Sequence, residues 1–548
     1  MSVDRTRMRW NGWGWAAHKD IVAPREELWT WLAAELGMPA LLATPARPLE
    51  ELTLPASKLS APDRTALNAI VGEENVRETA FERAFHALGR SYHDLLRLRA
   101  GDLSTAPDAV VYPRGTEEVL AVLALAAKQR IAVVPFGGGT SAVGGVSGTR
   151  GPFDTVITLD MSAMNRLIDI DPVSRTATAE AGINGPALEK ALREKGFTLG
   201  HMPDSFEFST LGGWIAQRDA GATDWLVVAK LATPRGLLST GDFPASAAGV
   251  QMKDIVAGSE GMFGVITEAV VRLHKLPQMS DCRAWLFRDF ESGAAAIRTA
   301  MQEGIACSTL FLSDAEETRF QRASHTLGKT PGIVQWLVAK YFKLRGYDKL
   351  PCKLAAVFEG DERIASFERD RFRAVARKHG ALSLGRGAGE QWRKTRFQAP
   401  YFRDTLLDRG VGIDMVETAA SWSKLEALHA GVQAALEAAI REAVPREGAR
   451  GLVMCRMAHA SPQGASLCFT VVFPRLLDGD IEQWRRIKNA AVEAVLANGG
   501  TLSHHLGVGQ DHLPWIAQEK GQLGIDVLRA VKAALDPEGI LNPGKLLP

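Results

Sequence analysis

The sequence has few cysteines, almost no net charge and no long apolar run. None of its five cysteines (Cys282, Cys307, Cys352, Cys455 and Cys468) forms a CxxC pair. That pattern argues against a disulfide framework or a metal site and fits reduced thiols in the cytoplasm. A formal net charge of +1 over 548 residues leaves no electrostatic footprint for nucleic acid. No apolar run reaches the roughly 20 residues that span a bilayer, and residues 1–20 do not have the form of a signal peptide.

Changes of pattern along the chain predict four parts. Residues 1–104 are expected to be mostly helical, because 29–37 and 80–101 space their apolar residues at helical intervals. Residues 105–277 mix strands and helices, including a strand, a helix, a strand and a glycine loop over 107–145, and we interpret them as an α+β nucleotide-binding domain. Residues 278–485 are expected to hold a second sheet, and residues 486–548 two helices joined through His504 and His505.

A glycine-rich loop follows the apolar segment 131–136. Its glycines, 137 to 139, let backbone N–H groups approach a phosphate closely, and Thr140 and Ser141 add hydroxyl donors. The loop lacks the GK[ST] ending of a P-loop. Its GxGxxA spacing fits a Rossmann loop, but residues 143–148 make a poor helix, which that fold requires. Taken alone, the loop is about equally consistent with a tight turn that binds nothing.

Two further turns rich in small and hydroxyl residues lie in the same predicted domain. One is PDSFEFST, residues 203–210, followed by Gly212 and Gly213; the other is GSEGMFGVIT, residues 258–267. Three such turns in one domain favour an extended ligand that is contacted from several loops.

These three segments, in this order, resemble the FAD-binding domain of the vanillyl-alcohol oxidase / p-cresol methylhydroxylase superfamily, and within it the alkylglycerone-phosphate synthase family. RWNGWGW, GHMPDSFEFSTLGGW, GSEGMFGVITEA, FEGDER and ANGGTLSHHLGVG carry the resemblance over most of the chain. It implies an α+β fold with a p-cresol methylhydroxylase-type (PCMH-type) FAD-binding domain of two subdomains. It also implies an α+β cap domain of the FAD-linked oxidase C-terminal type and a C-terminal segment that returns to the flavin.

The cofactor that the resemblance implies is noncovalent FAD, since the glycine loop holds no histidine for a covalent link. The implied FAD contacts are Pro135, Phe136, Gly137, Gly138, Gly139, Thr140, Ser141, Pro203, Asp204, Ser205, Phe206, Glu207, Phe208, Ser209, Gln217, Arg218, Asp219, Ala220, Glu260, Gly261, Met262, Phe263, Gly264, Val265 and Ile266.

The sequence departs from the family where the substrate would bind. The family uses a tyrosine as acid or base, and Cys468 stands at the best-aligned position. One family arginine falls at Phe311, which cannot bind an anion, whereas Arg403 matches the other. Of the family's three consecutive histidines, His504 and His505 remain. Loss of a general acid or base typically costs about 10²–10⁴-fold in rate, so these changes point away from the synthase reaction.

We therefore expect an FAD-dependent oxidoreductase on the synthase scaffold, acting on a hydroxylated, apolar or 2-hydroxy-acid substrate. Arg403 would hold a carboxylate, and His504 or His505 would act as base, since histidine titrates near neutral pH. On a strand only one of these two would face the flavin, and we favour His505. His459 is expected to be structural, Cys468 a small buried residue, and Asp204 and Glu260 hydrogen-bond partners for the flavin or for cap loop backbones. The alternatives are the synthase reaction, which exchanges an acyl for an alkyl chain, and a noncatalytic flavin-binding protein.

Residues 331–349 mix large apolar side chains with lysine and arginine. We expect an ordinary helix of the cap, with contact to a membrane surface as the alternative. The expected partners are a small-molecule or lipid-like substrate and, by resemblance, a second copy in a homodimer; no nucleic acid is expected. The expected location is the cytoplasm, with peripheral contact to the membrane as the alternative.

Overall fold

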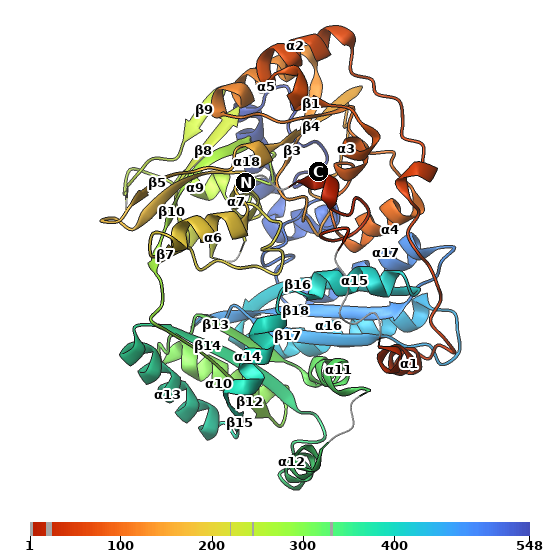
Figure 1. The fold of residues 1–548 in the computed structure, drawn as a ribbon, viewed down its shortest axis with the longest axis vertical. Helices are drawn as coiled ribbons and strands as arrows, with labels where there is room; N and C mark the ends of the chain where they lie inside the picture. The colour runs from red at the N-terminus through yellow and green to blue at the C-terminus, as the bar shows by residue number, and fades with distance from the viewer. Residues whose placement is uncertain (1–3, 18–24, 220, 244–245, 329–331) are drawn as a thin grey trace. The chain divides into compact units, whose positions relative to one another are not determined.

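The computed structural model describes residues 4–17, 25–219, 221–243, 246–328 and 332–548. The chain forms two compact units, drawn in Figure 1. Unit 1 consists of Met1–His18, Ala46–Leu276 and His505–Pro548, and unit 2 of Lys19–Pro45 and Pro277–His504. The four parts predicted from the sequence differ from this division, because residues 1–104 and 486–548 are each shared between the two units.

Unit 1 contains a small, mostly parallel sheet in the order β1-β2-β4-β3, in which only β1 is antiparallel to its neighbour. Its β3 is a nearly continuous apolar run, as expected of a strand covered on both faces, and it ends where the glycine loop begins. The helix α5 connects β2 to β3, as the sequence predicted. The bounds are β1 Val76–Arg77, β2 Ala109–Val111, α5 Thr116–Gln129, β3 Ile131–Phe136 and β4 Thr155–Asp160.

A second, antiparallel sheet completes the sheet structure of unit 1, in the order β5-β6-β10-β8-β9, with a separate two-stranded β7-β11 ribbon. Its strands are β5 Leu167–Asp171, β6 Thr176–Glu180, β7 Phe197–Thr198, β8 Leu226–Thr233, β9 Gly236–Ser239, β10 Val265–Arg272 and β11 His274–Lys275. The helices of unit 1 are α2 Ala61–Val71, α3 Ala80–Phe85, α4 Tyr92–Ala100, α6 Gly185–Arg193, α7 Leu211–Ala216, α8 Ala222–Trp225, α9 Lys253–Val256 and α18 Ile516–Leu535, with short 3₁₀ turns at Arg5–Arg7, Leu49–Glu51, Glu73–Asn75, Met161–Ala163 and Leu513–Trp515.

The end of the chain covers the free edge of β3. The amide of Val133 donates to the carbonyl of Ile540 at 2.9 Å, and the amide of Asn542 donates to the carbonyl of Val133 at 2.8 Å. An exposed strand edge is a site for unwanted pairing, and the tail removes it. The tail thus becomes part of the sheet from which the glycine loop leaves.

Unit 2 is built on one antiparallel sheet of seven strands, in the order β15-β12-β14-β13-β17-β18-β16. The strands β16, β17 and β18 pair over most of their length, and Phe469, Val471 and Phe473 of β18 are buried. The bounds are β12 Met279–Phe287, β13 Thr309–Ser313, β14 Cys352–Gly360, β15 Leu382–Leu384, β16 Val411–Ser421, β17 Leu452–Ala458 and β18 Gly464–Pro474.

The helices of unit 2 lie beside this sheet (Figure 1). They are α1 Glu26–Glu35, α10 Phe290–Gln302, α11 Ala315–Thr326, α12 Ile333–Leu344, α13 Glu362–Lys378, α14 Gly385–Thr395, α15 Ala399–Leu407, α16 Trp422–Ala443 and α17 Asp480–Ala497. In the part of the chain that the structure describes, no helix is both long and apolar enough to cross a bilayer.

The N-terminal region differs from the expected helical segment. The first α-helix begins at Glu26, and the described residues before it hold a three-residue 3₁₀ turn and an isolated antiparallel bridge between Met8 and Trp15. The helix expected over 80–101 is broken into α3 and α4, because Ser91 caps a new helix through its hydroxyl group and Asp94 completes a capping box.

Candidate functional site

Three turns of unit 1 that the sequence singled out lie at the ends of neighbouring elements. The glycine loop follows β3, the turn at 203–209 precedes α7, and the turn at 258–264 precedes β10. Thr210 fixes the second turn to α7, because its hydroxyl accepts a hydrogen bond from the Gly213 amide at the start of that helix.

The glycine loop, the turn at 258–264 and the residues at and around α7 line a cavity that encloses, with its mouth, about 660 Å³. Nine of the predicted FAD-contacting residues line it: Pro135, Phe136, Gly137, Gln217, Glu260, Gly261, Gly264, Val265 and Ile266. Gly138 and Phe208 line a second cavity of about 370 Å³, which shares Gly137 and Thr210 with the first.

Glycine is required in this cradle because backbones meet there. A Cβ atom on Gly138 would lie 2.1 Å from the carbonyl oxygen of Phe208, and one on Gly137 would lie 2.4 Å from the hydroxyl oxygen of Thr210. The approach leaves bare backbone along the cavity wall, which is the surface that a dinucleotide pyrophosphate needs. The residues present therefore fit FAD.

The remaining predicted contacts lie outside the linings of these two cavities, and a direct role for them stays a prediction. Several have another partner: the Ser141 hydroxyl accepts from the Gly145 amide, the Ser209 hydroxyl accepts from the Trp214 indole, and the Asp219 carboxylate lies 3.0 Å from His201. Ala220 lies outside the described residues. The others are Gly139, Thr140, Pro203, Asp204, Ser205, Phe206, Glu207, Arg218, Met262 and Phe263.

The cavity wall also includes residues that the sequence did not single out as FAD contacts. Thr210, Gly212 and Gly213 belong to the second turn and the glycines after it, which the sequence had already marked. Their small side chains could therefore have identified them as residues of the cavity wall. The others had no comparable signal, because they reach the wall from loops, a 3₁₀ turn and the end of α7: Gly145, Val146, Met161, Ala181 and Ala216.

Glu260 joins the cavity wall to the C-terminal segment. Its carboxylate accepts hydrogen bonds from the amides of Val508 at 2.6 Å and Gly509 at 2.7 Å, and the side-chain amide of Asn542 donates to its carbonyl at 2.6 Å. Burial raises the pKa of Glu260 to about 7, against the opposing effects of these two N–H donors and of Lys545. A backbone partner was the role expected of Glu260.

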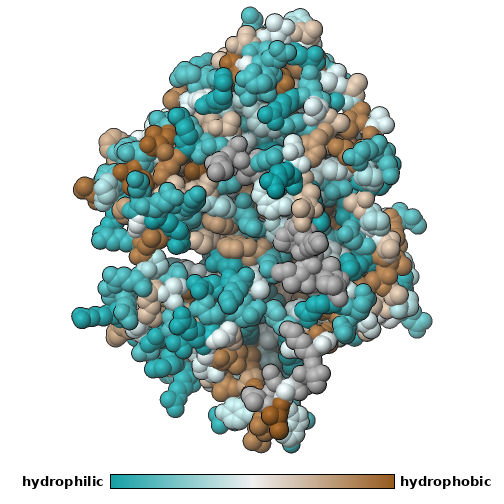
Figure 2. Space-filling model, viewed as in Figure 1, coloured by the Kyte–Doolittle hydropathy of each residue, from teal (hydrophilic) through white to brown (hydrophobic). Residues whose placement is uncertain are grey.

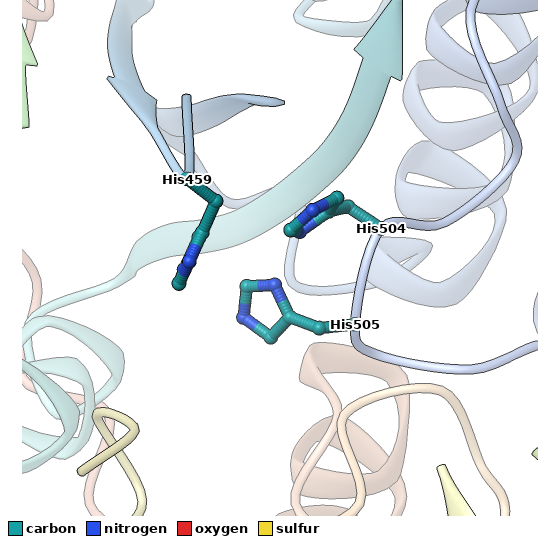
Figure 3. A group of neighbouring side chains, drawn as sticks. All are labelled: His459, His504 and His505. Carbon is teal, nitrogen blue, oxygen red and sulfur yellow. The ribbon is translucent and has the colours of Figure 1, made fainter. Parts of the chain in front are cut away.

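Figure 3 shows His459, His504 and His505 turned toward one another. The rings of His459 and His504 are 5.1 Å apart between centroids, and His505 is the next residue along the chain. Ring nitrogens of the three lie within 4.8 Å of one another. Such a set can hold a proton or share a metal ion, and the sequence predicted no metal. The expected strand was wrong: residues 501–510 form bends and turns, so strand alternation cannot decide between His504 and His505.

The candidate substrate residues of unit 2 lie on its sheet and on α15. Arg403 is half-buried on α15. Phe311 packs against Trp392 at 5.0 Å between ring centroids, and the guanidinium of Arg456 lies 5.4 Å from its ring. That guanidinium is paired with Glu317 at 2.6 Å. Cys468 faces Arg456 in the β17–β18 register and is half-buried, not the fully buried residue expected.

Comparison with known proteins identifies the family of this chain. Residues 107–240 match the model of the FAD binding domain, and residues 276–546 match the model of the FAD linked oxidases, C-terminal domain. The chain is 34% identical over 512 residues to an alkyldihydroxyacetonephosphate synthase of Trypanosoma brucei brucei, covering 90% of this chain and 82% of that one. It is 31% identical to the synthase of Dictyostelium discoideum, covering 99% and 94%.

A solved structure of an alkyldihydroxyacetonephosphate synthase is similar to this chain with a TM-score of 0.85 and 29% identity, covering 99% of this chain and all of that one. The chain therefore belongs to the alkyldihydroxyacetonephosphate synthase family of FAD-linked oxidases. It is an FAD-dependent enzyme, and the α+β fold class and FAD as the cofactor are confirmed, whereas the noncovalent attachment of FAD stays a prediction.

Replacing Gly138 with alanine should weaken FAD binding by about tenfold to a hundredfold, because forced overpacking typically costs about 1–3 kcal/mol. The flavin-to-protein absorbance ratio and FAD titration of the apoprotein measure this. The matched control is Gly115→Ala, where an added Cβ meets nothing within 4 Å. Equal FAD affinity in both variants would contradict the role assigned to Gly138.

The raised pKa of Glu260 predicts a pH dependence of stability. The pKa of about 7 lies above the ordinary value of 4.5, so the contribution of this group is full below pH 4.5 and is lost as the pH rises through 7. The free energy of unfolding of the wild type relative to Glu260→Gln should therefore fall over that window. Urea denaturation at several pH values tests it, with the exposed Glu117→Gln as control; a difference that stays constant or grows with pH would rule it out.

Proposed function

We propose that this enzyme oxidises a hydroxylated, lipid-like substrate. The observation that carries the proposal is the pair of hydrogen bonds from Val508 and Gly509 to Glu260, because they tie the segment that begins at His505 to a wall of the FAD cavity. FAD, when bound, supplies a two-electron acceptor. His505 takes the proton of the substrate hydroxyl group, with His504 beside it, since histidine serves as a base near neutral pH.

The positions of the tyrosines support a reaction other than the synthase exchange. The resemblance implies a tyrosine as acid or base, yet strands β17 and β18 hold none, and Cys468 occupies the matching place. The five tyrosines of the chain all lie elsewhere: Tyr92 and Tyr112 are buried in unit 1, Tyr341 is on α12, Tyr347 donates to the carbonyl of Gly380, and Tyr401 is on α15.

The synthase reaction, which the names of the relatives describe, is the second candidate. Arg456 favours it, because this cation beside Phe311 could substitute for the missing family arginine and act with Arg403 on a phosphate. Its ion pair with Glu317 weakens that argument, since a phosphate would have to compete with a carboxylate at 2.6 Å. A noncatalytic role is set aside because the chain belongs to a family of enzymes.

A 2-hydroxy acid is a narrower form of the first proposal. Arg403 on α15 is half-buried, and a guanidinium binds a carboxylate through two parallel hydrogen bonds. Both substrate types lose hydrogen from a carbon that carries a hydroxyl group, so they share the proposed base and differ in whether Arg403 is needed.

Mixing the holoenzyme with substrate in the absence of oxygen should bleach the flavin absorbance. A panel of long-chain alcohols and 2-hydroxy acids would identify the substrate class. His505→Ala should slow bleaching by about 10²–10⁴-fold, whereas the exposed His274→Ala of the same unit should not. Flavin content is measured for each variant, so that loss of FAD is not mistaken for loss of base.

Two outcomes would contradict this proposal. One is that no hydroxylated compound reduces the flavin. The other is incorporation of a labelled long-chain alcohol into alkyl-dihydroxyacetone phosphate, which would establish the synthase reaction instead.

We also propose that α12 contacts a membrane surface. An ordinary cap helix buries its apolar face, but none of the α12 side chains that the structure describes is buried: Ile333 is 76% exposed, Leu337 54% and Leu344 85%. Figure 2 shows hydrophobic side chains gathered at the foot of the view, over α12. The ammonium of Lys340 lies 4.0 Å from the centre of the Trp336 ring. Apolar and basic groups together suit an anionic bilayer surface.

Replacing Trp336 and Leu337 together with glutamate should reduce binding to anionic phospholipid vesicles at least about tenfold, because both apolar area and charge complementarity are lost. Co-sedimentation measures it. Glutamates at Ile364 and Phe367, which are 63% and 62% exposed on α13, are the control and should leave binding unchanged. Failure of the wild type to bind vesicles would end this proposal. The cytoplasmic location and the homodimer stay predictions.

A further inference from the structure

The first described segment of the chain, residues 4–17, forms a small hairpin. The amide of Arg9 donates to the carbonyl of Gly14 at 2.9 Å, and the amide of Ala16 donates to the carbonyl of Arg7 at 2.8 Å. The side chains of Met8, Trp10 and Trp13 are buried. The N-terminal hairpin, as we call residues 4–17, contains the RWNGWGW motif, and neither the FAD cavity's three turns nor the proposed reaction accounts for it.

Arg5 connects the hairpin to the glycine loop. One terminal nitrogen of its guanidinium donates to the carbonyl of Gly137 at 2.6 Å and to the carboxylate of Asp160 at 2.9 Å. Its Nε lies 2.7 Å from the other carboxylate oxygen of Asp160, and both side chains are buried. Asp160 ends β4, and its carboxylate also lies 2.8 Å from the His86 ring. The sheet therefore fixes the guanidinium through Asp160, and the guanidinium in turn binds the glycine loop through the Gly137 carbonyl.

The electrostatics of this cluster match the geometry. Burial by itself would raise the pKa of Asp160, but the charge of Arg5 and the contact with His86 hold that pKa well below its usual range. Asp160 is thus a carboxylate, and Arg5 is fixed opposite it. The guanidinium also lies 5.3 Å from the centre of the Phe136 ring, at the end of β3.

Two tryptophans connect the same hairpin to the turn at 203–209. The rings of Trp13 and Trp15 lie 5.6 Å and 5.4 Å from the ring of Phe208, both edge to face. Edge-to-face pairs of this kind add about 0.5–1.5 kcal/mol beyond the area they bury. Phe208 is the residue whose carbonyl closes on Gly138, so the hairpin contacts one partner of that backbone approach and, through Gly137, the residue next to the other.

Arg90 makes a third connection. Its Nε donates to the carbonyl of Gly12 at 2.7 Å, while its backbone amide donates to the carbonyl of Ser141 at 2.7 Å. Arg5 and Met8 of the hairpin line the smaller cavity together with Gly137, Gly138, Phe208 and Thr210.

We propose that the N-terminal hairpin is a fourth wall of the FAD cradle, in which Arg5 and Trp15 are positioning residues for the glycine loop and the 203–209 turn. The smaller cavity is then a compartment of the same site and takes part of the dinucleotide. The hairpin limits the rate at which FAD leaves. This inference rests on FAD binding and not on the reaction proposed above, so it stands whichever substrate is found.

FAD release from the holoenzyme tests the proposal. The rate is followed by the rise in flavin fluorescence after dilution, and the dissociation constant by titration of the apoprotein. Arg5→Ala should weaken FAD binding by about tenfold to a hundredfold, the cost of losing a hydrogen bond to a charged group. The matched control is Arg7→Ala, an exposed arginine in the same turn, which should bind as the wild type does.

A double variant separates positioning from charge balance. Removal of Arg5 leaves the buried Asp160 without its cation, so Arg5→Gln is combined with Asp160→Asn. If Arg5 positions Gly137, this double variant still releases FAD faster than Asp160→Asn alone. Equal FAD affinity and release in these two proteins would overturn the role of Arg5.

Trp15→Ala tests the other contact without a buried charge. Trp15 is only half-buried, and its loss should speed FAD release while the apoprotein still unfolds in a single cooperative thermal transition. This variant also decides the question if Arg5→Ala does not fold. A Trp15→Ala protein that retains FAD as the wild type does would overturn the proposal.

Discussion

The approach of two backbones, at Gly138 and at Phe208, is the constraint on which the FAD cradle depends. No side chain fits between them. The two segments are about 70 residues apart, so the approach must be imposed from outside. The parallel sheet sets where the glycine loop leaves β3, Thr210 anchors the 203–209 turn to α7, and the N-terminal hairpin contacts both. Each of these supports stabilises one geometry of bare amide groups, which could not hold a pyrophosphate if the loops moved independently.

Buried polar groups carry much of this positioning. Glu260 is held by amides of the C-terminal segment, Asn542 donates to the carbonyls of Gly145 and Glu260, and the buried Lys545 donates to the carbonyl of Ser147. Desolvating such groups is costly, and an apolar substitute of the same shape is often no less stable. Their advantage is geometric, because each hydrogen bond has a required direction and unites segments that are far apart in sequence. Polar networks of this kind suit a site where loop positions matter more than stability.

Local pattern was enough to predict the elements that frame the site. The apolar run at 131–136, the helix before it and the three turns are where the sequence placed them, because burial on both faces and glycine spacing leave local marks. Contacts between residues that are far apart in the sequence leave no local pattern. Arg5 and Gly137 are separated by 132 residues, and nothing near Arg5 indicates its partner. The His504–His505 segment was mistaken for a strand because its structure comes from Gly507 and Gly509, both at positive φ, and from Glu260, which replaces a strand partner.

Unit 1 is assembled from three stretches of chain, with most of unit 2 inserted before the last. The strand edge beside the glycine loop is paired by residues 540–542, which follow unit 2 in the sequence. During synthesis the chain emerges from its N-terminus, and domains generally fold as they become complete. Unit 2 is therefore complete before unit 1, although the glycine loop is made first. The finished cradle can therefore capture FAD only after residues 540–542 have been made, so the glycine loop remains without its full support through most of synthesis.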